Sequence, residues 1–483
     1  MSDQRLDQCM SFVGDRLTYL IVELKERLLG LVIFRLAFLA WSLAKAGSFW
    51  VRGNDFESAD ATLYYSRILT VGRSVGPLPV ASVVRRRNTG IVKRCRGVAG
   101  ENYLLASYVK SREAEATRQE FARLGLEWAR AMKYPRADDR PDREGDLLVL
   151  KPFVSPRERG VLLVCYNDSL RRFAALYDLR QLAERYVFVL EPSTWGYEDA
   201  TFLSYSGLPT DVVVESQYRP DYDYIRGIGG NMHPIALGAG DWVDPDAFRC
   251  GDSIEKKYDI VMVASWLALK RHALLFSALR SVGDRIGRVA LIGYPFNGRT
   301  LEDIKAEAAT HGVLDMLDIH EQIPFEKVSE ILQQSKVSAM LSKREGASRA
   351  LYESLFANTP VVVSRSNVGI NRDHVNGQTG MLSADDELGS TLLWMVENAH
   401  LFTPRAWAIK NTGYRRSTER LNKTLKDLAA MRGEDWTVDI FSKRNRHNAV
   451  FVNPEERRLA REHLGELGSF LRGSVTGTRG ASE

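Results

Sequence analysis

The chain has 483 residues, 45% of them hydrophobic and 26% charged, which is an ordinary globular composition with room for about three domains or subdomains. A formal charge of +5 is small for this length, so the composition gives no reason to expect a nucleic-acid-binding protein. The cysteines lack CxxC spacing and histidine partners, which argues against a disulfide framework or a zinc site and fits a reducing cytoplasm. They are Cys9, Cys95, Cys165 and Cys250.

The N-terminal residues carry a strongly apolar stretch. Residues 28–44 are mostly apolar, but Arg35 interrupts them and makes spanning a bilayer costly. Upstream leucines and an isoleucine recur at spacings of four and three, as in an amphipathic helix or a short coiled coil. We interpret this segment as an in-plane membrane helix or a self-association helix, which would make a homo-oligomer, rather than a secretion signal. A buried helix is the alternative.

A basic segment follows, with six cations between Arg85 and Arg96. It would suit anionic lipid headgroups or a pyrophosphate-linked acceptor, and a solvated loop is the alternative. A helix is expected from Val109 to Met132. The proline-rich, charged residues 135–145 then read as an exposed linker. We therefore assign residues 1–150 to an N-terminal extension.

Two series of short apolar runs come next, separated by helical or loop stretches, and this pattern predicts two doubly wound α/β domains. The first series lies in residues 151–250 and the second in residues 251–410. Residues 411–483 form a C-terminal helical segment whose tail, residues 471–483, we expect to be disordered. The predicted strands are Gly160–Cys165, Tyr186–Leu190, Asp211–Glu215, Tyr258–Ala264, Arg288–Gly293, Asp315–His320, Val337–Leu341 and Pro360–Ser364.

The most informative motif is Glu345-Gly-Ala-Ser-Arg-Ala-Leu-Tyr-Glu353, which is followed by a short β-branched strand. Eight residues of α-helix bring the second carboxylate back to within about 80° of the first, so both can line one elongated pocket. Glu345 lies where a loop becomes a helix, and free amides at such a helix start favour an anionic ligand. On solvated helices such a pair also arises by chance.

This motif resembles the E-x7-E motif of retaining GT-B glycosyltransferases of the family 4 type. The resemblance covers residues 259–400 well and residues 160–248 loosely, and residues 234–248 resemble the hinge between the two domains of that family. It implies a fold of two Rossmann-like domains facing a cleft. The second domain would bind a nucleotide sugar, and the first would bind the acceptor.

The resemblance also implies roles for individual residues. Lys270, which follows a strand and opens a helix, would neutralise the leaving diphosphate, and Glu345 would face the sugar. Glu353 would accept hydrogen bonds from the ribose hydroxyls. The implied donor-binding residues are Ser265, Lys270, Arg271, Gly346, Ala347, Ser348, Arg349 and Glu353.

The chain departs from the family pattern at two places. Ser265 stands where many relatives have a phosphate-binding arginine, for which Arg271 and Arg349 are the candidate substitutes. Ala347 and Ser348 replace the usual aromatic residue and glycine. These departures keep open a catalytically silent homologue that binds nucleotide or glycan as a scaffold.

Two acidic triplets, Asp221-Tyr-Asp223 and Asp244-Pro-Asp246, have the oxygen ligands that a divalent cation prefers, but short acidic triplets also arise by chance. We expect no metal site and no cofactor. His233, His272 and His374 are candidate proton carriers, although isolated histidines are more often structural.

The sequence thus predicts a metal-independent retaining glycosyltransferase. It would transfer a sugar from a nucleotide-sugar donor to a glycan or lipid-linked acceptor in polysaccharide or glycoconjugate biosynthesis. We expect it in the cytoplasm, with peripheral contact at the inner face of the plasma membrane. A nucleotide-sugar epimerase or phosphorylase on the same fold is a further alternative.

Overall fold

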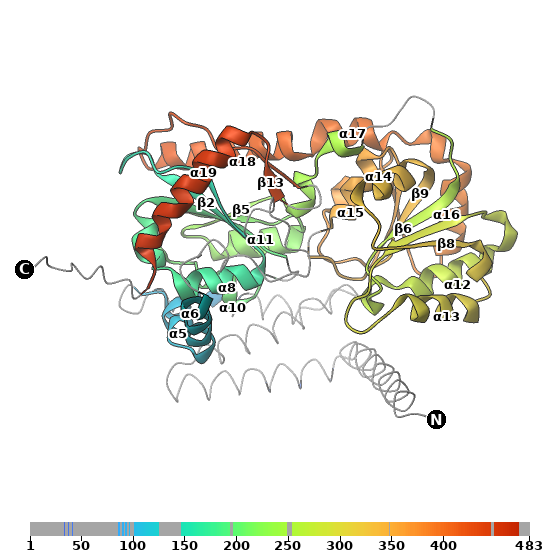
Figure 1. Cartoon of the computed structure of the whole chain (residues 1–483), viewed down its shortest axis with the longest axis horizontal. Coiled ribbons are helices and arrows are strands. Elements are labelled where there is room, and N and C mark those ends of the chain that lie inside the picture. The colour runs from blue at the N-terminus through green and yellow to red at the C-terminus, as the bar shows by residue number, and fades with distance from the viewer. Residues whose placement is uncertain are drawn as a thin grey trace, which may run out of the picture.

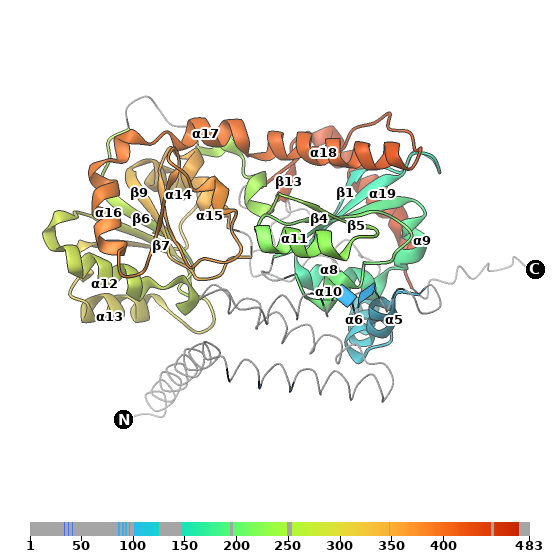
Figure 2. The ribbon, with the colours of Figure 1, turned by 180° about the vertical axis from the view of Figure 1, so that it is seen from behind.

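A computed structural model gives the fold of the chain. It describes residues 101–124, 146–193, 197–248, 254–346, 348–445 and 449–472, together with a few single positions between residues 33 and 96. Two α/β domains lie side by side, and helices from the C-terminal segment run across both (Figures 1 and 2).

The first domain is built on a sheet in the order β1-β2-β3-β4-β5. Strands β2 to β5 are parallel, and β1 joins the edge antiparallel to β2. Every residue of β1 to β4 is buried, as expected for strands covered on both faces. The bounds are β1 Leu147–Lys151, β2 Gly160–Cys165, β3 Tyr186–Glu191, β4 Val212–Glu215 and β5 Met232–Ile235.

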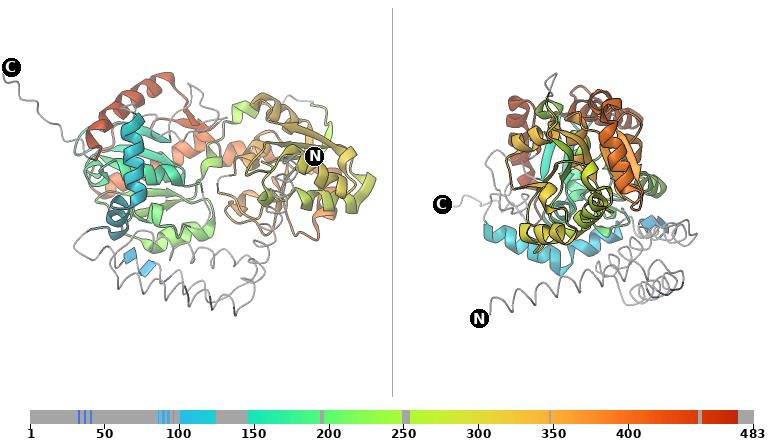
Figure 3. Two further views of the ribbon diagram at one scale, coloured as in Figure 1. Left: turned by 60° about the horizontal axis from the view of Figure 1, so that its bottom comes forward. Right: turned by 90° about the vertical axis from the view of Figure 1, so that its right-hand side faces the viewer.

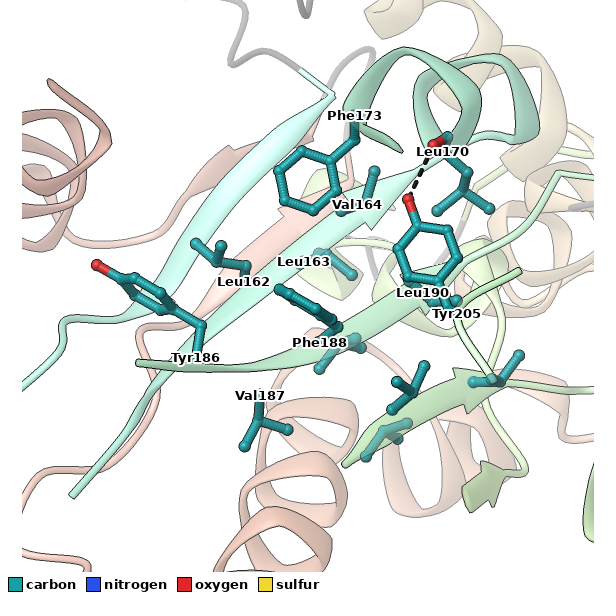
Figure 4. Close-up of a cluster of buried hydrophobic side chains, with 14 of the residues drawn as sticks. Leu162, Leu163, Val164, Leu170, Phe173, Tyr186, Val187, Phe188, Leu190 and Tyr205 are labelled. Atoms are coloured by element: carbon teal, nitrogen blue, oxygen red, sulfur yellow. Dashed lines mark hydrogen bonds between the residues drawn. The ribbon is translucent and has the colours of Figure 1, made fainter. Parts of the chain in front are cut away.

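Helices cover both faces of this sheet and leave a continuous core. Phe173 of α8 packs edge-on against Phe188 of β3, and the Tyr205 hydroxyl donates to the Leu170 carbonyl at 2.8 Å (Figure 4). The helices are α8 Asn167–Leu176, α9 Leu179–Ala183, α10 Ala200–Leu203 and α11 Arg219–Ile228.

The second domain has a six-stranded sheet in the order β11-β10-β9-β6-β7-β8, and all its strand pairs are parallel. The chain adds strands on one side of β6 up to β8 and then crosses back, so that β9, β10 and β11 lie on the other side of β6. The strands are β6 Tyr258–Val263, β7 Val289–Gly293, β8 Leu317–Glu321, β9 Ser335–Met340, β10 Val361–Ser364 and β11 Gly380–Ser383. The helices are α12 His272–Val282, α13 Leu301–Thr310, α14 Phe325–Gln333, α15 Arg349–Phe356 and α16 Leu388–Glu397.

The C-terminal segment returns to the first domain after α17 (Figure 1). The long helix α18 runs from the hinge across the top of the first domain (Figures 1 and 2). A small two-stranded sheet and α19 then pack on the same domain. Arg432, after the end of α18, pairs with Asp211, and Asp244 of the hinge pairs with Arg444 at 3.0 Å. The bounds are α17 Pro404–Asn411, α18 Tyr414–Met431, β12 Lys443–Asn445, β13 Ala449–Phe451 and α19 Pro454–Glu466.

The short 3₁₀ helices η2 Ala239–Trp242 and η3 Pro245–Phe248 connect the two domains. The remaining 3₁₀ turns are η4 Ala268–Lys270, η5 Gly283–Arg285, η6 Leu314–Met316, η7 Arg372–His374, η8 Ala399–Leu401 and η9 Leu467–Phe470.

The helix predicted from Val109 to Met132 corresponds to α6 Arg112–Leu124, and a further helix, α5 Tyr103–Val109, precedes it. Both helices pack against the first domain (Figure 3). Each has its own start signal, since Asn102 accepts from Leu105 N and Ser111 accepts from Ala114 N. Residues 125–132 and most of the apolar stretch 28–44 and of the basic stretch 85–96 lie outside the described residues, as does nearly all of the tail predicted to be disordered. None of the helices that the structure describes is both long and apolar enough to cross a bilayer.

Candidate active site

The site forms at the carboxyl ends of β6 and β9, where ligands bind in open parallel sheets. Because β6 and β9 are neighbours, the loops that follow them come together although about 75 residues separate them. Lys270 ends a 3₁₀ turn after β6, and Glu345 lies in the loop after β9.

Lys270 and Glu345 form an ion pair, with Lys270 Nζ 2.7 Å from Glu345 Oε1. The side chains are 23% and 11% exposed, so the pair is largely shielded yet open to the solvent on one side. The structure therefore brings together the two residues to which the sequence assigned catalysis.

Two residues that the sequence analysis missed hold Glu345 in place. The Ser342 hydroxyl donates to Glu345 Oε1 at 2.5 Å. The Asn367 amide donates to the Ser342 carbonyl at 2.7 Å and to its hydroxyl oxygen at 3.2 Å. Both Ser342 and Asn367 are buried. The position of Ser342 just beyond a predicted strand was a usable signal, whereas nothing local marks Asn367.

The backbone of the Glu345 loop is fixed by the segment after β10. Glu345 N donates to the Val368 carbonyl, and Val368 N donates to the Lys343 carbonyl, both at 2.8 Å. Gly369 follows with a φ of +109°, and a Cβ there would lie 1.8 Å from the Glu345 carbonyl oxygen. Only glycine fits this position, because both the conformation and the contact exclude a side chain.

Helix α15 starts directly after the Glu345 loop. The Ser348 hydroxyl contacts Met340 Sδ at 3.5 Å instead of capping the first turn. Arg349 opens the helix and is partly buried, and Glu353, a turn further, is only 7% exposed. Gly346 is partly buried next to Glu345, and Ala347 lies outside the described residues.

The remaining predicted donor-binding residues lie after β6. Ser265 is buried at the strand end. Arg271 adopts a left-handed conformation with a φ of +64° and directs its guanidinium to Asp385 and to the Leu341 carbonyl, the latter at 3.1 Å. Arg271 is therefore anchored beside the loop of Glu345, with its charge largely offset by Asp385.

The first domain reaches this site through Gln217, another residue that the sequence analysis did not single out. It follows β4, and its Nε2 donates to the Gly369 carbonyl at 2.8 Å and approaches the Gly346 carbonyl at 3.5 Å. These bonds cross from one domain to the other and meet the two glycines that flank Glu345. The carboxyl ends of both sheets thus face the same place.

Both acidic triplets are engaged in structural contacts. Asp221 is buried and accepts from Tyr197 N, and Asp223 pairs with Arg219 and Arg226. The second triplet pairs with Arg444 and Arg415. Across the part of the chain that the structure describes, no group of three or more His, Cys, Asp or Glu side chains has an arrangement that could hold a metal ion.

The histidines occupy structural positions. His374 lies between Tyr352, at 2.8 Å, and Asn371, at 3.0 Å, and His233 bonds to Asp211 at 2.8 Å. His272 is buried beside Trp266, and burial lowers its pKa to about 3, with the charges of Arg299 and Lys270 adding to the shift. A neutral imidazole with so low a pKa is poorly suited to carry a proton near pH 7.

Two Rossmann-like domains joined by a hinge, with a C-terminal helix crossing back, form the GT-B architecture, so the predicted fold class is confirmed. Residues 245–400 match the model of the family described as glycosyl transferases group 1. This match lies over the second domain, and it confirms the resemblance at this level and supports glycosyl transfer as the activity.

Other comparisons are more distant. No curated protein sequence matches the chain. The Alr3699/HepE protein from Anabaena, in complex with UDP and glucose, has 14% identity and a TM-score of 0.41, with 52% of this chain and 80% of that chain covered. Sucrose-phosphate synthase (tll1590) from Thermosynechococcus elongatus has 16% identity and a TM-score of 0.46, with 56% and 74% covered.

Proposed function

We propose that the chain is a retaining glycosyltransferase of the family 4 type, which moves a sugar from a nucleoside diphosphate donor to a hydroxyl of a glycan or lipid-linked acceptor. The observation that carries the proposal is the ion pair of Lys270 and Glu345 within a domain of the group 1 family. A cation and a carboxylate in contact at the ends of parallel strands offer one group to the diphosphate and one to the sugar.

In this proposal Lys270 exchanges Glu345 for the diphosphate of the donor and stabilises the negative charge that develops as the glycosidic bond breaks. Glu345, still held by Ser342, then accepts hydrogen bonds from sugar hydroxyls. Backbone amides at the start of α15 add to the phosphate site because the Ser348 side chain does not occupy them. Glu353 remains our proposed ribose ligand.

The proposed mechanism needs no divalent ion, because Lys270 and helix-start amides supply the positive charge. Retention would follow from attack of the acceptor on the face from which the diphosphate leaves, with a departing phosphate oxygen taking the acceptor proton. The product is then the glycoside with the donor's anomeric configuration, plus the nucleoside diphosphate.

The acceptor side is proposed at the cytoplasmic face of the plasma membrane, with peripheral attachment through residues 28–44 and self-association through the same N-terminal helix. Deleting residues 1–50 should move the protein off vesicles that contain anionic lipid. An unchanged distribution in flotation would favour the alternative of a buried helix.

The central test compares Lys270→Ala with Lys305→Ala, a matched change on the exposed face of α13 in the same domain. After a thermal-shift screen has selected the nucleotide sugar, Lys270→Ala should lower kcat roughly 10²–10³-fold, as removal of one preorganised charge does, with little change in melting temperature. Lys305→Ala should keep normal turnover. Full activity in Lys270→Ala would refute the role of this residue.

Product analysis tests the remaining claims. An α-linked donor should give an α-linked product by NMR, and EDTA should leave the rate largely unchanged. A β-linked product would exclude retention. Nucleotide binding with no release of diphosphate product would instead identify a silent scaffold.

A further inference from the structure

A pocket lies between the first domain, the η7 loop of the second domain and the C-terminal segment. This pocket, with a volume of about 440 Å³, is formed by the ends of β4 and β5, the start of α11, the η7 loop after β10 and one face of α18. Its size is within the range of small-molecule sites. The side chains that matter for its chemistry are Gln217, Arg219, Tyr222, Asp373, Arg420 and Lys423.

The pocket adjoins the loop of Glu345. Gln217 lines the pocket and also bonds to the Gly369 and Gly346 carbonyls, so its side chain connects the two regions. Asn371, two residues after Gly369, lines the pocket from the second domain. A molecule held here would therefore lie next to the loop that carries Glu345, on the side of the first domain.

The charges of the lining side chains favour an anion. Arg219, Arg420 and Lys423 supply three positive charges from two helices, against the single carboxylate of Asp373. Arg420 and Lys423 are three residues apart on α18, so they project from the same face of this helix. All three cations line the same pocket, so one ligand can reach them together.

Present partners hold these cations only weakly. Arg219 pairs with Asp223 at 3.0 Å, and Lys423 pairs with Asp427 at 2.6 Å, but both pairs are exposed. Exposed ion pairs contribute little and exchange readily. Arg420 donates one bond, from Nη2 to the Ala236 carbonyl at 2.9 Å, which leaves the rest of its guanidinium for a ligand.

We propose that this pocket binds a phosphate or pyrophosphate group of the acceptor, a proposal that rests on the proposed function and specifies its acceptor class. Arg219 and Arg420 present planar donors that match phosphate oxygens, Lys423 adds a point charge, and the Tyr222 hydroxyl can donate a further bond. The acceptor sugar would extend past Gln217 toward Glu345. A lipid-linked phosphate and a soluble sugar phosphate share this chemistry.

The first experiment measures the binding of inorganic pyrophosphate to the full chain by calorimetry. Arg420→Gln/Lys423→Gln should weaken pyrophosphate binding at the pocket at least tenfold. Lys270→Ala should remove only the pyrophosphate that binds at the donor site and leave binding at the pocket unchanged. The matched control is Arg416→Gln/Lys426→Gln, the same charge change on α18 away from the pocket lining, and it should bind normally. Binding should also weaken with added salt.

Two results would overturn the proposal. One is unchanged pyrophosphate binding in Arg420→Gln/Lys423→Gln, and the other is complete loss of binding in Lys270→Ala, which would place all of it at the donor site. Because this readout does not need turnover, it remains informative if no glycosyl transfer is found. Nucleotide binding by Arg420→Gln/Lys423→Gln reports on the donor site alone, because the pocket is disabled in this variant.

A competition experiment distinguishes the two sources of the phosphate. Vesicles carrying a polyprenyl phosphate should displace pyrophosphate from Lys270→Ala if the acceptor is lipid-linked. A sugar 1-phosphate should do so if the acceptor is soluble. If neither competes, an acceptor phosphate site is excluded. In the active protein, Arg420→Gln/Lys423→Gln should raise the KM of the competing acceptor and leave the donor KM unchanged.

Discussion

Replacing Lys443 with Met tests how the C-terminal segment is anchored to the first domain. Lys443 Nζ lies 2.5 Å from Glu191 Oε2, and the two side chains are 0% and 4% exposed. The ammonium also lies 4.5 Å from the centre of the Trp242 ring. Burial, and then the charge of Glu191, raises the pKa of Glu215, a second carboxyl near Lys443, well above its ordinary value and so favours its neutral form.

Removing one partner of such a buried pair typically costs about 3–5 kcal/mol, because the other charge remains buried without compensation. We therefore expect Lys443→Met to lower the free energy of unfolding of the first domain by about 4 kcal/mol, a large share of the roughly 5–15 kcal/mol of a native protein. Adding Glu191→Gln should restore a large part of this loss, since no buried charge is then left unpaired.

The assay is guanidinium unfolding followed by tryptophan fluorescence, to which the buried Trp242 contributes, with the denaturant slope compared between variants. Lys327→Met, which breaks an exposed pair with Glu330 in α14, is the control and should leave the midpoint unchanged. A loss below about 1 kcal/mol in Lys443→Met, or no recovery with Glu191→Gln, would refute the assignment of this pair as the anchor.

Three further outcomes are expected. Asn367→Ala should lower kcat roughly tenfold or more with nearly unchanged donor binding, because Ser342 loses the two hydrogen bonds that hold it against Glu345. An unchanged kcat in steady-state kinetics would show that Asn367 does not position Glu345 through Ser342. Gly369→Ala should abolish turnover by displacing the Glu345 carbonyl, with normal circular dichroism, and an active variant would contradict the contact. Burial opposes ionisation of Glu158, yet hydrogen bonds from Lys151 and Thr437 lower its pKa to about 2. The free energy of unfolding should therefore fall as the pH drops from about 4.5 toward 2. Denaturant unfolding of Glu158→Gln should show a smaller loss of stability over the same pH range.

The sequence predicted the two α/β series because buried parallel strands are short apolar runs, and these can be recognised locally. The list of predicted strands lacks β1, β5, β11, β12 and β13, and β1 and β12 were missed for different reasons. Leu147–Lys151 is apolar but follows a charged linker, and its membership of the sheet depends on antiparallel pairing with β2. Lys443–Asn445 is polar, and Lys443 is buried only because Glu191 lies opposite it, a partner 252 residues away.

The candidate site, like the fold, could be predicted only in part. Lys270 and Glu345 could be named because the motifs that contain them resemble those of a known family, and each also follows a predicted strand. Gln217 and Asn367 could not, since their roles come from bonds to backbone carbonyls across 152 and 25 residues. Amides that position a loop leave no pattern in composition, spacing or charge.

The ion pair of Lys270 and Glu345 also bears on how the site would distinguish substrate from product. A nucleoside diphosphate that takes Lys270 leaves Glu345 with Ser342 alone at 11% exposure, whereas a nucleotide sugar satisfies both charges, one with phosphate and one with hydroxyls. Wild-type protein should therefore hold the spent nucleotide less tightly than its Lys270 contact suggests, which favours product release. Glu345→Gln should tighten binding of the nucleoside diphosphate several-fold and weaken binding of the nucleotide sugar, as measured by calorimetry on both ligands. Equal losses for the two ligands would mean that Glu345 orders the loop and does not compete for Lys270.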